Sequence, residues 1–418
     1  MDACRMILLV LLLGLLAIAA TPLASAAEDA KDDAKDDSKD SKDSKDDSKD
    51  SKGSKGSASD LTADFYKESC PDAEKIIAGV IEKKFKEDPG TAAGLLRLIF
   101  HDCFANGCDA SLLIDPLSNQ SAEKEAGPNI SVRGYEVIDD AKKALEEKCP
   151  NTVSCADIIS VGTRDAVKLA GGPDYEVKMG RRDSLVSNRE EADNNLPGPD
   201  VPVPKLASEF LSRGFNSEEM VALLAGGHSI GKVRCIFIEP DATPMEAGYS
   251  ASISKLCDGP NRDTGFVNMD ENNPNVIDGS YFANVIAMKM PLTIDRLLAL
   301  DSKTTPIIEG MLKKTDDFMP GFSKAMEKLS ALNVITGKEG EIRKTCSEFN
   351  NPMPPTGGSV IRMSSADPAD LEGLSDGKSK QVSDIASQGS KDPLAPELPA
   401  VSSPRKKASG KHHKLRGD

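Results

Sequence analysis

The sequence contains no tryptophan, few histidines and no excess of basic charge. Of its 418 residues none is Trp and four are His, and the formal net charge at pH 7 is -15. Binding to nucleic acids needs clustered Lys and Arg to contact phosphates, so this balance argues against a nucleic-acid partner. The length allows one large domain or two smaller ones.

Long apolar runs are also missing, apart from one at the start of the chain. Residues 1–26 combine a basic residue, Arg5, with an apolar stretch and the small-residue ending Ala24-Ser25-Ala26. This pattern is typical of a secretory signal peptide, and its apolar core is short for a membrane span. We therefore expect cleavage, export and no membrane association afterwards. An uncleaved N-terminal anchor is the alternative.

No Cys-x-x-Cys pair occurs, so a zinc site is a poor interpretation of the nine cysteines. Cys4 lies in the signal peptide, and the other eight are Cys70, Cys103, Cys108, Cys149, Cys155, Cys235, Cys257 and Cys346. An even number of cysteines in an exported chain predicts four disulfides. Their spacing alone leaves the connectivity open.

Aromatic and branched apolar residues are absent from residues 27–59, an imperfect Lys-Asp-Ser repeat. Such a segment cannot bury enough surface to offset its ordering entropy, so we expect a disordered linker. Residues 351–418 are rich in Ser, Asp, Lys and Pro, and we expect a disordered C-terminal tail there. The globular part then spans residues 60–350.

Strand signals are few and short in the globular part. Apolar residues instead recur at helical spacing in eight segments: 73–86, 91–104, 135–149, 154–171, 203–214, 217–227, 280–289 and 320–333. Several of these segments end in Gly, as helices often do. The pattern predicts an all-α domain with long loops and minor short strands.

Only two histidines fall in the globular part, His101 and His228, each near the end of an apolar helix. Arg97 and His101 stand at i and i+4, so they share a helix face. An arginine beside a histidine among apolar residues has no packing value. It suits a histidine that acts as a base beside a fixed cation. The alternative is a histidine that only fills a core position.

The loop that follows His101 is rich in oxygen ligands. Asp102, Asp109 and Ser111 offer side-chain oxygens, and the carbonyls of Ala105 and Gly107 can add more. Hard oxygen ligands in a tight loop suit calcium, although the spacing is not that of an EF-hand. An acidic turn with a hydrogen-bonded Asp is the alternative.

The segment 224–231, LAGGHSIG, contains the Gly-x-Ser-x-Gly pattern of many hydrolases around Ser229. That pattern needs a strand before the serine and a histidine later in the chain. The preceding residues are helical, and the only later histidines, His412 and His413, lie in the tail. Ser229 therefore lacks a general base, and the hydrolase interpretation fails.

Several segments together resemble the secretory plant (class III) haem peroxidases. They are RLIFHDCFANGCDASLL (97–113), GRRDS (180–184), NLPGP (195–199) and LAGGHSIG, supported by FYKESCP (65–71), TVSCAD (152–157), LAGGP (169–173) and GEIRKTC (340–346). Their order and separations also match, over residues 60–350. The resemblance implies an all-α fold of two lobes with one haem b between them. It also implies four disulfides: Cys70–Cys149, Cys103–Cys108, Cys155–Cys346 and Cys235–Cys257.

The resemblance also assigns roles to the residues on either side of the haem. His101 matches the distal base, and Arg97 matches the cation that stabilises charge as the O–O bond breaks. Asn129 accepts from the other His101 nitrogen, and Glu123 supports Asn129.

On the opposite side, His228 matches the proximal iron ligand and Asp295 its buried carboxylate partner. Pro197 matches the position that contacts aromatic donors at the haem edge.

Two bound calcium ions are implied as well. The first set comprises Asp102, Ala105, Gly107, Asp109, Ser111 and Glu123, the last through water. The second set comprises Ser229, Asp270, Asn273, Val276 through its carbonyl, and Asp278.

Some positions depart from the family pattern. Met269 stands where an aromatic residue is usual, Asn273 where Thr or Ser is usual, and Tyr175 where Trp is common. The segment after Asn129 is one residue shorter, which we expect to disturb the aim of Asn129 at His101. The span from Cys235 to Cys257 is also shorter.

The implied function is that of a secreted, monomeric haem peroxidase. It would reduce hydrogen peroxide and oxidise small aromatic, phenolic donors by one-electron steps, in cell-wall (lignin-type) and oxidative-stress chemistry. Its expected location is extracellular or in the cell wall, with the vacuole as another destination. The alternative is a catalytically weak peroxidase-fold protein with a binding or structural role at the wall.

Overall fold

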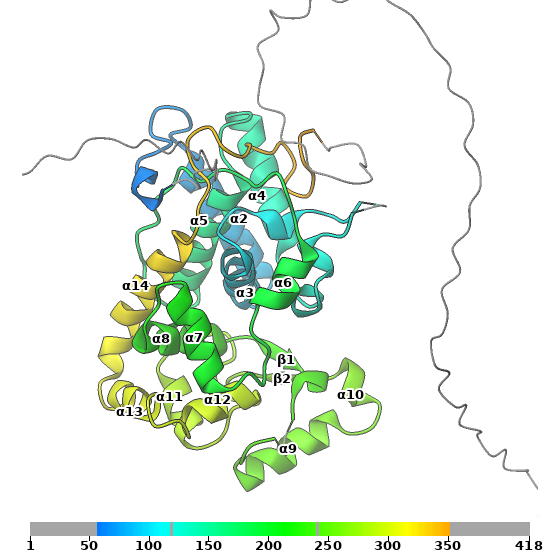
Figure 1. Ribbon diagram of the computed structural model, residues 1–418, viewed down its shortest axis with the longest axis vertical. Coiled ribbons are helices and arrows are strands. Elements are labelled where there is room, and N and C mark those ends of the chain that lie inside the picture. The colour runs from blue at the N-terminus through cyan, green and yellow to red at the C-terminus, as the bar shows by residue number, and fades with distance from the viewer. Residues whose placement is uncertain (1–56, 118–119, 240–241, 352–418) are drawn as a thin grey trace, which may run out of the picture. The chain divides into compact units, whose positions relative to one another are not determined.

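The computed structural model describes residues 57–117, 120–239 and 242–351, and this part of the chain is mainly helical (Figure 1). Its α-helices are α2 (Ala73–Glu87), α3 (Thr91–Ala105), α4 (Tyr135–Lys148), α5 (Cys155–Leu169), α6 (Arg189–Asn195), α7 (Val203–Ser212), α8 (Ser217–His228), α9 (Ala247–Cys257), α10 (Asn261–Thr264), α11 (Ser280–Ile286), α12 (Thr293–Leu298), α13 (Thr305–Lys313) and α14 (Phe318–Ser330). The predicted all-α fold is confirmed.

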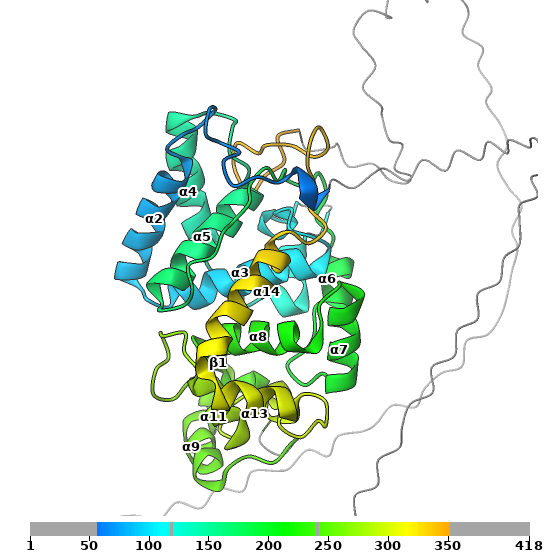
Figure 2. The same cartoon turned by 90° about the vertical axis from the view of Figure 1, so that its left-hand side faces the viewer.

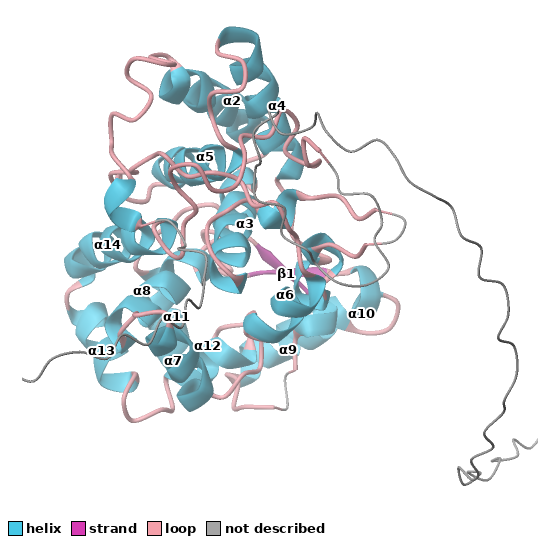
Figure 3. Ribbon diagram, turned by 45° about the horizontal axis from the view of Figure 1, so that its top comes forward, coloured by secondary structure: helices cyan, strands magenta, loops and turns pink. Residues whose placement is uncertain are grey.

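Short elements complete the described part of the chain. The 3-10 turns are η1 (Ala58–Asp60), η2 (Ser111–Leu113), η3 (Glu123–Glu125), η4 (Gly127–Asn129), η5 (Cys235–Phe237) and η6 (Thr315–Asp317). Strands β1 (Lys232–Arg234) and β2 (Phe266–Asn268) pair antiparallel, with Val233 opposite Val267. Figure 3 shows this small sheet among the helices. None of the helices in the described ranges is long and apolar enough to cross a membrane.

Most of the two expected tails lies outside the described residues, as does the expected signal peptide 1–26. One boundary differs from the expectation. Residues 58 and 59, which the sequence assigns to the linker, form η1 together with Asp60. The reason is local, because Ser57 caps this turn and Thr336 donates to the Asp60 carboxylate at 2.8 Å. These contacts extend the folded part to Ser57.

Helix α3 lies between two groups of helices. In Figures 1 and 2, α2, α4 and α5 gather on one side of α3, while α7, α8, α11 and α13 lie on the other side. Residues of α3 contact α2 and α5 in the first group, and α8 and α14 in the second. Two lobes therefore meet at α3, as predicted, and α3 and α8 face each other at the junction.

Local sequence signals explain where the helices of the junction begin. Asn216 accepts from the Glu219 amide at 2.8 Å and Glu219 accepts from the Asn216 amide at 2.9 Å, so a capping box starts α8. In α5, the Ser154 hydroxyl caps the Asp157 amide at 3.1 Å. Helix α8 then runs uninterrupted to His228 at its last position.

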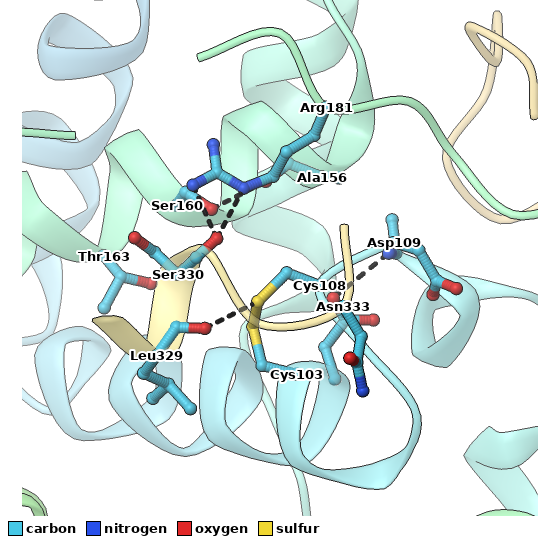
Figure 4. Close-up of a disulfide and its surroundings, with 12 residues drawn as sticks. Cys103, Cys108, Asp109, Ala156, Ser160, Thr163, Arg181, Leu329, Ser330 and Asn333 are labelled. Carbon is cyan, nitrogen blue, oxygen red and sulfur yellow. Dashed lines mark hydrogen bonds between the residues drawn. A yellow bond between two sulfur atoms is a disulfide. The ribbon is translucent and has the colours of Figure 1, made fainter. Parts of the chain in front are cut away.

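Four disulfides are formed, and they are the pairs that the resemblance implies: Cys70–Cys149, Cys103–Cys108, Cys155–Cys346 and Cys235–Cys257. The loop closed by Cys103–Cys108 lies against the end of α14, where the Cys108 amide donates to Leu332 O at 3.0 Å (Figure 4). The loop that follows His101 is thereby held against the other lobe.

A buried ion pair connects the same region to α5. Arg181 donates to Asp157 Oδ1 at 2.7 Å, and both side chains are fully buried. The guanidinium also donates to Ser330 O at 2.8 and 2.6 Å, as Figure 4 shows. Tyr66 donates to the other Asp157 oxygen at 2.6 Å. Each polar group therefore has partners, which burial of a charged pair requires.

Arg181→Met should destabilise the protein strongly, because it leaves the Asp157 carboxylate buried beside no cation. The expected loss is about 3–5 kcal/mol in the free energy of unfolding, measured by denaturant titration. The matched control is Arg189→Met, since Arg189 pairs with Asp193 at the surface. That loss should be no more than about 1 kcal/mol, and equal losses in the two variants would contradict the argument.

Candidate active site

One face of α3 is incompletely buried although the rest of the helix lies in the core. The exception comprises Ala93, Arg97, Phe100 and His101, which recur at helical spacing. Helix α8 has a similar face, formed near its end by Leu224, Gly227 and His228. A methyl group added at Gly227 would meet no atom within 4 Å. The two histidines of the globular part therefore lie on the accessible faces of two otherwise buried helices.

Two hydrogen bonds fix the tautomer of His101. The Asn129 amide nitrogen donates to the carbonyl of Glu123 at 2.8 Å, so Asn129 Oδ1 is the atom that lies 2.6 Å from His101 Nδ1. An amide oxygen can only accept, hence Nδ1 carries the proton. Arg97 Nε, which can only donate, lies 3.2 Å from His101 Nε2, so Nε2 carries the lone pair.

The surroundings of His101 also keep the ring neutral. Burial and the neighbouring Arg97 charge lower the pKa of His101 to about 3, and the hydrogen bond with Asn129 acts in the opposite direction. A neutral imidazole with the lone pair on Nε2 can accept a proton from a bound molecule.

Arg97 is held by groups that the sequence does not reveal as partners. Its terminal nitrogens donate to Ser131 Oγ at 2.9 Å and to Pro128 O at 2.7 Å. Both acceptors are neutral, and no carboxylate of the described residues forms an ion pair with Arg97. Its positive charge is therefore not neutralised by the protein.

His228 has a hydrogen-bonded side and an open side. Its Nδ1 lies 2.9 and 3.1 Å from the two oxygens of Asp295, which is fully buried in α12. Tyr281 in α11 donates to Asp295 Oδ1 at 2.8 Å. None of the hydrogen bonds in the described part of the chain involves His228 Nε2, although the side chain is 29% exposed.

These features fit a flat cofactor with a metal at its centre. An imidazole whose Nδ1 donates to a carboxylate and whose Nε2 is bare is the usual form of a metal-ligating histidine. His101 and His228 are both only partly buried, so each ring keeps accessible surface at the junction of α3 and α8. The residues present therefore suit haem, with His228 as the one available iron ligand.

Three carboxylates cluster behind His101. Asp102 accepts the amides of Ala110 and Leu112 at 3.1 and 3.3 Å, and Asp109 accepts that of Ser111 at 3.1 Å. Burial, followed by mutual repulsion, raises the pKa of Asp102 well above its usual range. Burial and the charge of Asp109 raise the pKa of Glu123 to about 8. Ionisation of all three carboxyls is therefore costly, and only Asp109 gains from a nearby cation, Arg343.

Two oxygens of this cluster lack hydrogen-bond partners. Ser111 Oγ and Glu123 Oε2 are buried and accept or donate no bond within the described residues. Orphaned buried oxygens next to repelling carboxylates fit a hard cation such as calcium. The expected carbonyl ligand of Ala105 already accepts from the Asn195 amide at 2.7 Å, which leaves one lone pair free. Gly107 lies in the same loop, with a positive φ.

The second expected ligand set is only partly brought together. Asp270, Asn273 and Asp278 share one turn, in which Asn273 Nδ2 donates to Asp278 at 3.3 Å. The Asp270 carboxylate already accepts from Ser280 at 2.5 Å and from Asn284 at 3.0 Å. In the described ranges no three carboxylate, imidazole or thiolate groups are placed to hold a metal ion by themselves, so both expected sets would need hydroxyl and carbonyl oxygens as further ligands.

Three other expected residues have no side-chain bond to either set. The Ser229 hydroxyl donates to Gly226 O at 3.1 Å, within its own helix end. Val276 is 44% exposed, and its amide donates to Asn273 O. Pro197 is partly buried in the loop after α6, and no hydrogen bond connects it with the histidines.

Two departures from the family pattern have clear structural outcomes. The shorter segment after Asn129 does not disturb its aim, so that expectation was wrong. The turn η4 and the bond from Asn129 to Glu123 O direct the amide at His101 regardless. Met269 is buried, and its amide donates to Gly231 O at 3.0 Å, just beyond the His228 helix.

Comparison with known proteins places this geometry in a family. Residues 77–314 match the family model described as peroxidase. Peroxidase 44 of Arabidopsis thaliana is 43% identical over 295 residues, which cover 70% of this chain and 94% of that protein. Peroxidase 28 of Arabidopsis thaliana is 42% identical over 306 residues, with the same coverage.

A further relative is named for the formation of lignin. The lignin-forming anionic peroxidase of Nicotiana sylvestris is 37% identical over 297 residues, which cover 70% of this chain and 92% of that protein.

The carboxylate cluster predicts an unusual pH dependence of stability when calcium is removed by a chelator. With its pKa at about 8, against an ordinary 4.5, folded Glu123 holds a proton that the unfolded chain has released. The melting temperature should therefore fall as the pH rises from about 4.5 to about 8. Glu123→Gln should flatten this slope.

The control for this experiment is Glu125→Gln, an exposed neighbour on the same turn. It should keep the wild-type slope of melting temperature against pH. Equal slopes in wild type and Glu123→Gln would contradict the prediction, because they would mean that ionisation of Glu123 does not lower the stability of the folded protein.

Proposed function

The chain belongs to the plant (class III) peroxidase family, haem enzymes that reduce hydrogen peroxide, and from this premise we propose how its residues divide the work. The proposal rests on one observation, the shared hydrogen-bonding pattern of the two imidazoles. His101 and His228 each have Nδ1 engaged by an acceptor and Nε2 on an accessible helix face.

His228 would hold the iron of a single haem b through Nε2. Haem b, when bound, supplies an iron centre that hydrogen peroxide oxidises by two electrons and that donors reduce one electron at a time. Asp295 accepts the Nδ1 proton of His228 and keeps the ring in the tautomer that leaves Nε2 free. It also makes the imidazole more electron-rich, which favours O–O cleavage.

On the opposite side, His101 handles the proton. Its unprotonated Nε2 would accept a proton from hydrogen peroxide, in place of the long bond from Arg97 Nε, and return it to the oxygen that leaves as water. Asn129 holds the ring for both steps, since Nδ1 donates to the same amide oxygen throughout. Arg97, fixed by Ser131 and Pro128, stabilises the negative charge that develops on the departing oxygen.

The donor is a small aromatic molecule of the phenolic class. Support comes from the sequence resemblance, in which Pro197 matches the position that contacts such donors at the haem edge, and from the lignin-forming relative. We expect a secreted monomer of the extracellular space or cell wall, after removal of residues 1–26. A non-catalytic role at the wall is not favoured, because the whole His101 and His228 arrangement is retained.

Two calcium ions would support this arrangement. The first would balance the charge of Asp102, Asp109 and Glu123, directly behind His101, and its fit rests on the orphaned oxygens of that cluster. The second would join Ser229 to the 270–278 segment. The backbone already links these segments, because Gly231 donates to Pro274 O at 2.7 Å.

An absorbance spectrum of the purified protein, expressed with haem, tests the proposal. A Soret band that shifts on addition of hydrogen peroxide supports it. Absence of the band would overturn haem binding, and a band indifferent to peroxide would overturn the assigned activity.

Replacement of the two histidines should separate binding from chemistry. His101→Ala should retain the Soret band but react with hydrogen peroxide roughly 10²–10⁴-fold more slowly, since it lacks the proton acceptor. His228→Ala should lose or weaken the haem instead. Stopped-flow absorbance and haem titration measure the two effects, and the reverse pattern would mean that the two sides are interchanged.

The pH profile of the peroxide reaction reports the pKa of His101. Because that pKa lies at about 3, the rate constant should stay level through the acidic range and fall only as the pH nears that value. Arg97→Leu should shift this acid limb upward, because it removes a charge that lowers the pKa. Exposed Arg189→Leu should leave the limb in place. A wild-type limb near 6.5, the ordinary imidazole value, would contradict the assignment.

A further inference from the structure

The carboxylate behind His228 has a second donor. Asp295 Oδ1 accepts from His228 Nδ1 at 2.9 Å and from the Tyr281 hydroxyl at 2.8 Å. Oδ2 lies 3.1 Å from the same imidazole nitrogen. The imidazole and the phenol therefore share the lone pairs of one oxygen atom.

No other group of the described residues donates to this carboxylate. The nearest cation on its own helix, Arg296, directs its nitrogens to Thr243 Oγ1 at 2.8 Å and to the carbonyls of Glu239, Met290 and Pro291. Asp295 is completely buried, so water does not compete. In such surroundings each of the two donors carries a large share of the stabilisation of the negative charge.

Tyr281 is held firmly enough for this contact to be a fixed feature. It is 1% exposed and occupies the second position of α11, which packs against both α12 and α8. Its ring makes an edge contact with Phe282 at a centroid distance of 5.6 Å. The preceding residue, Ser280, donates to Asp270 and fixes the start of the helix.

We propose that Tyr281 is a positioning residue that limits how strongly Asp295 draws the Nδ1 proton of His228, and that it thereby tunes the electron donation of His228 to the haem iron. The inference rests on the proposed role of His228 as the iron ligand. A phenol donor lowers the basicity of the carboxylate, so the imidazole keeps more of its proton and donates less through Nε2.

Removal of the hydroxyl predicts the direction of change. In Tyr281→Phe the carboxylate has only His228 as a donor and draws its proton more strongly. The imidazole then gains negative character, the iron–histidine bond strengthens, and the ferric state is favoured. The iron–histidine stretching frequency of the ferrous holoenzyme should rise, and the ferric/ferrous reduction potential should fall.

The chain offers a matched control in Tyr249. It too is a buried tyrosine, and its hydroxyl has no hydrogen-bond partner in the described part of the chain. Burial raises the pKa of Tyr249, and the charges of Glu271 and, more weakly, of Asp295 act in the same direction, so the phenol lies within the electrostatic reach of the Asp295 carboxylate. Tyr249→Phe removes the same atom without breaking a bond to Asp295.

The experiment is resonance Raman spectroscopy and redox titration of the haem-loaded wild type, Tyr281→Phe and Tyr249→Phe. The proposal expects a higher stretching frequency and a lower potential in Tyr281→Phe only. Equal values in Tyr281→Phe and wild type, or equal shifts in both variants, would overturn it.

A second substitution keeps the test decisive if Tyr281→Phe fails to fold or to bind haem. Incorporation of 3-fluorotyrosine at position 281 retains the hydroxyl and makes it a stronger donor. It should lower the stretching frequency and raise the reduction potential, the reverse of Tyr281→Phe. Unchanged values would overturn the proposal.

The proposed iron ligand is tested separately. If the wild-type iron–histidine band persists in His228→Ala, the ligand assignment fails. If the band is lost in His228→Ala but keeps its wild-type frequency in the variants at position 281, only the inference about Tyr281 fails.

Discussion

A hydrogen-bond acceptor behind each imidazole is the constraint on which the site depends. Asn129 and Asp295 engage the Nδ1 atoms of His101 and His228, so each ring keeps its lone pair on Nε2. In His101 this lone pair faces Arg97 Nε at 3.2 Å, and in His228 it has no partner among the described residues. The two acceptors differ in charge. The neutral amide raises the basicity of His101 only in part, against burial and the Arg97 charge, whereas the carboxylate enriches His228 in electrons. Histidine would therefore transfer a proton on one side of the site and ligate the iron on the other.

The scaffold supports these acceptors from a distance. Two 3-10 turns, η3 and η4, aim Asn129 through the carbonyl of Glu123, a residue that also belongs to the buried carboxylate cluster. On the other side Ser280 joins Asp270 to the start of α11, where Tyr281 reaches Asp295. The first proposed calcium set is therefore one hydrogen bond from Asn129, and the second is linked to Asp295 through Ser280 and Tyr281. Through these contacts a bound calcium ion would affect the orientation of the two imidazoles.

The sequence predicts those parts of the site that are local in the chain. Arg97 and His101 share a helix face because they are four residues apart, and the helix periodicity alone shows this. The contacts of Arg97 with Pro128 and of Tyr281 with Asp295 join separate segments, so no spacing reveals them. Helix α9 (Ala247–Cys257) was not among the predicted segments because its apolar residues form no clear stripe. The cysteine pairs came from the resemblance and not from their spacing.

The position of the proton on each imidazole tests the account most directly. Neutron diffraction from crystals of the haem-loaded protein, exchanged into deuterated buffer near neutral pH, measures it. The account predicts deuterium on Nδ1 of both His101 and His228, directed at Asn129 Oδ1 and Asp295, and none on Nε2 of either ring. Deuterium on Nε2 of His101, or a proton transferred fully to Asp295, would contradict it.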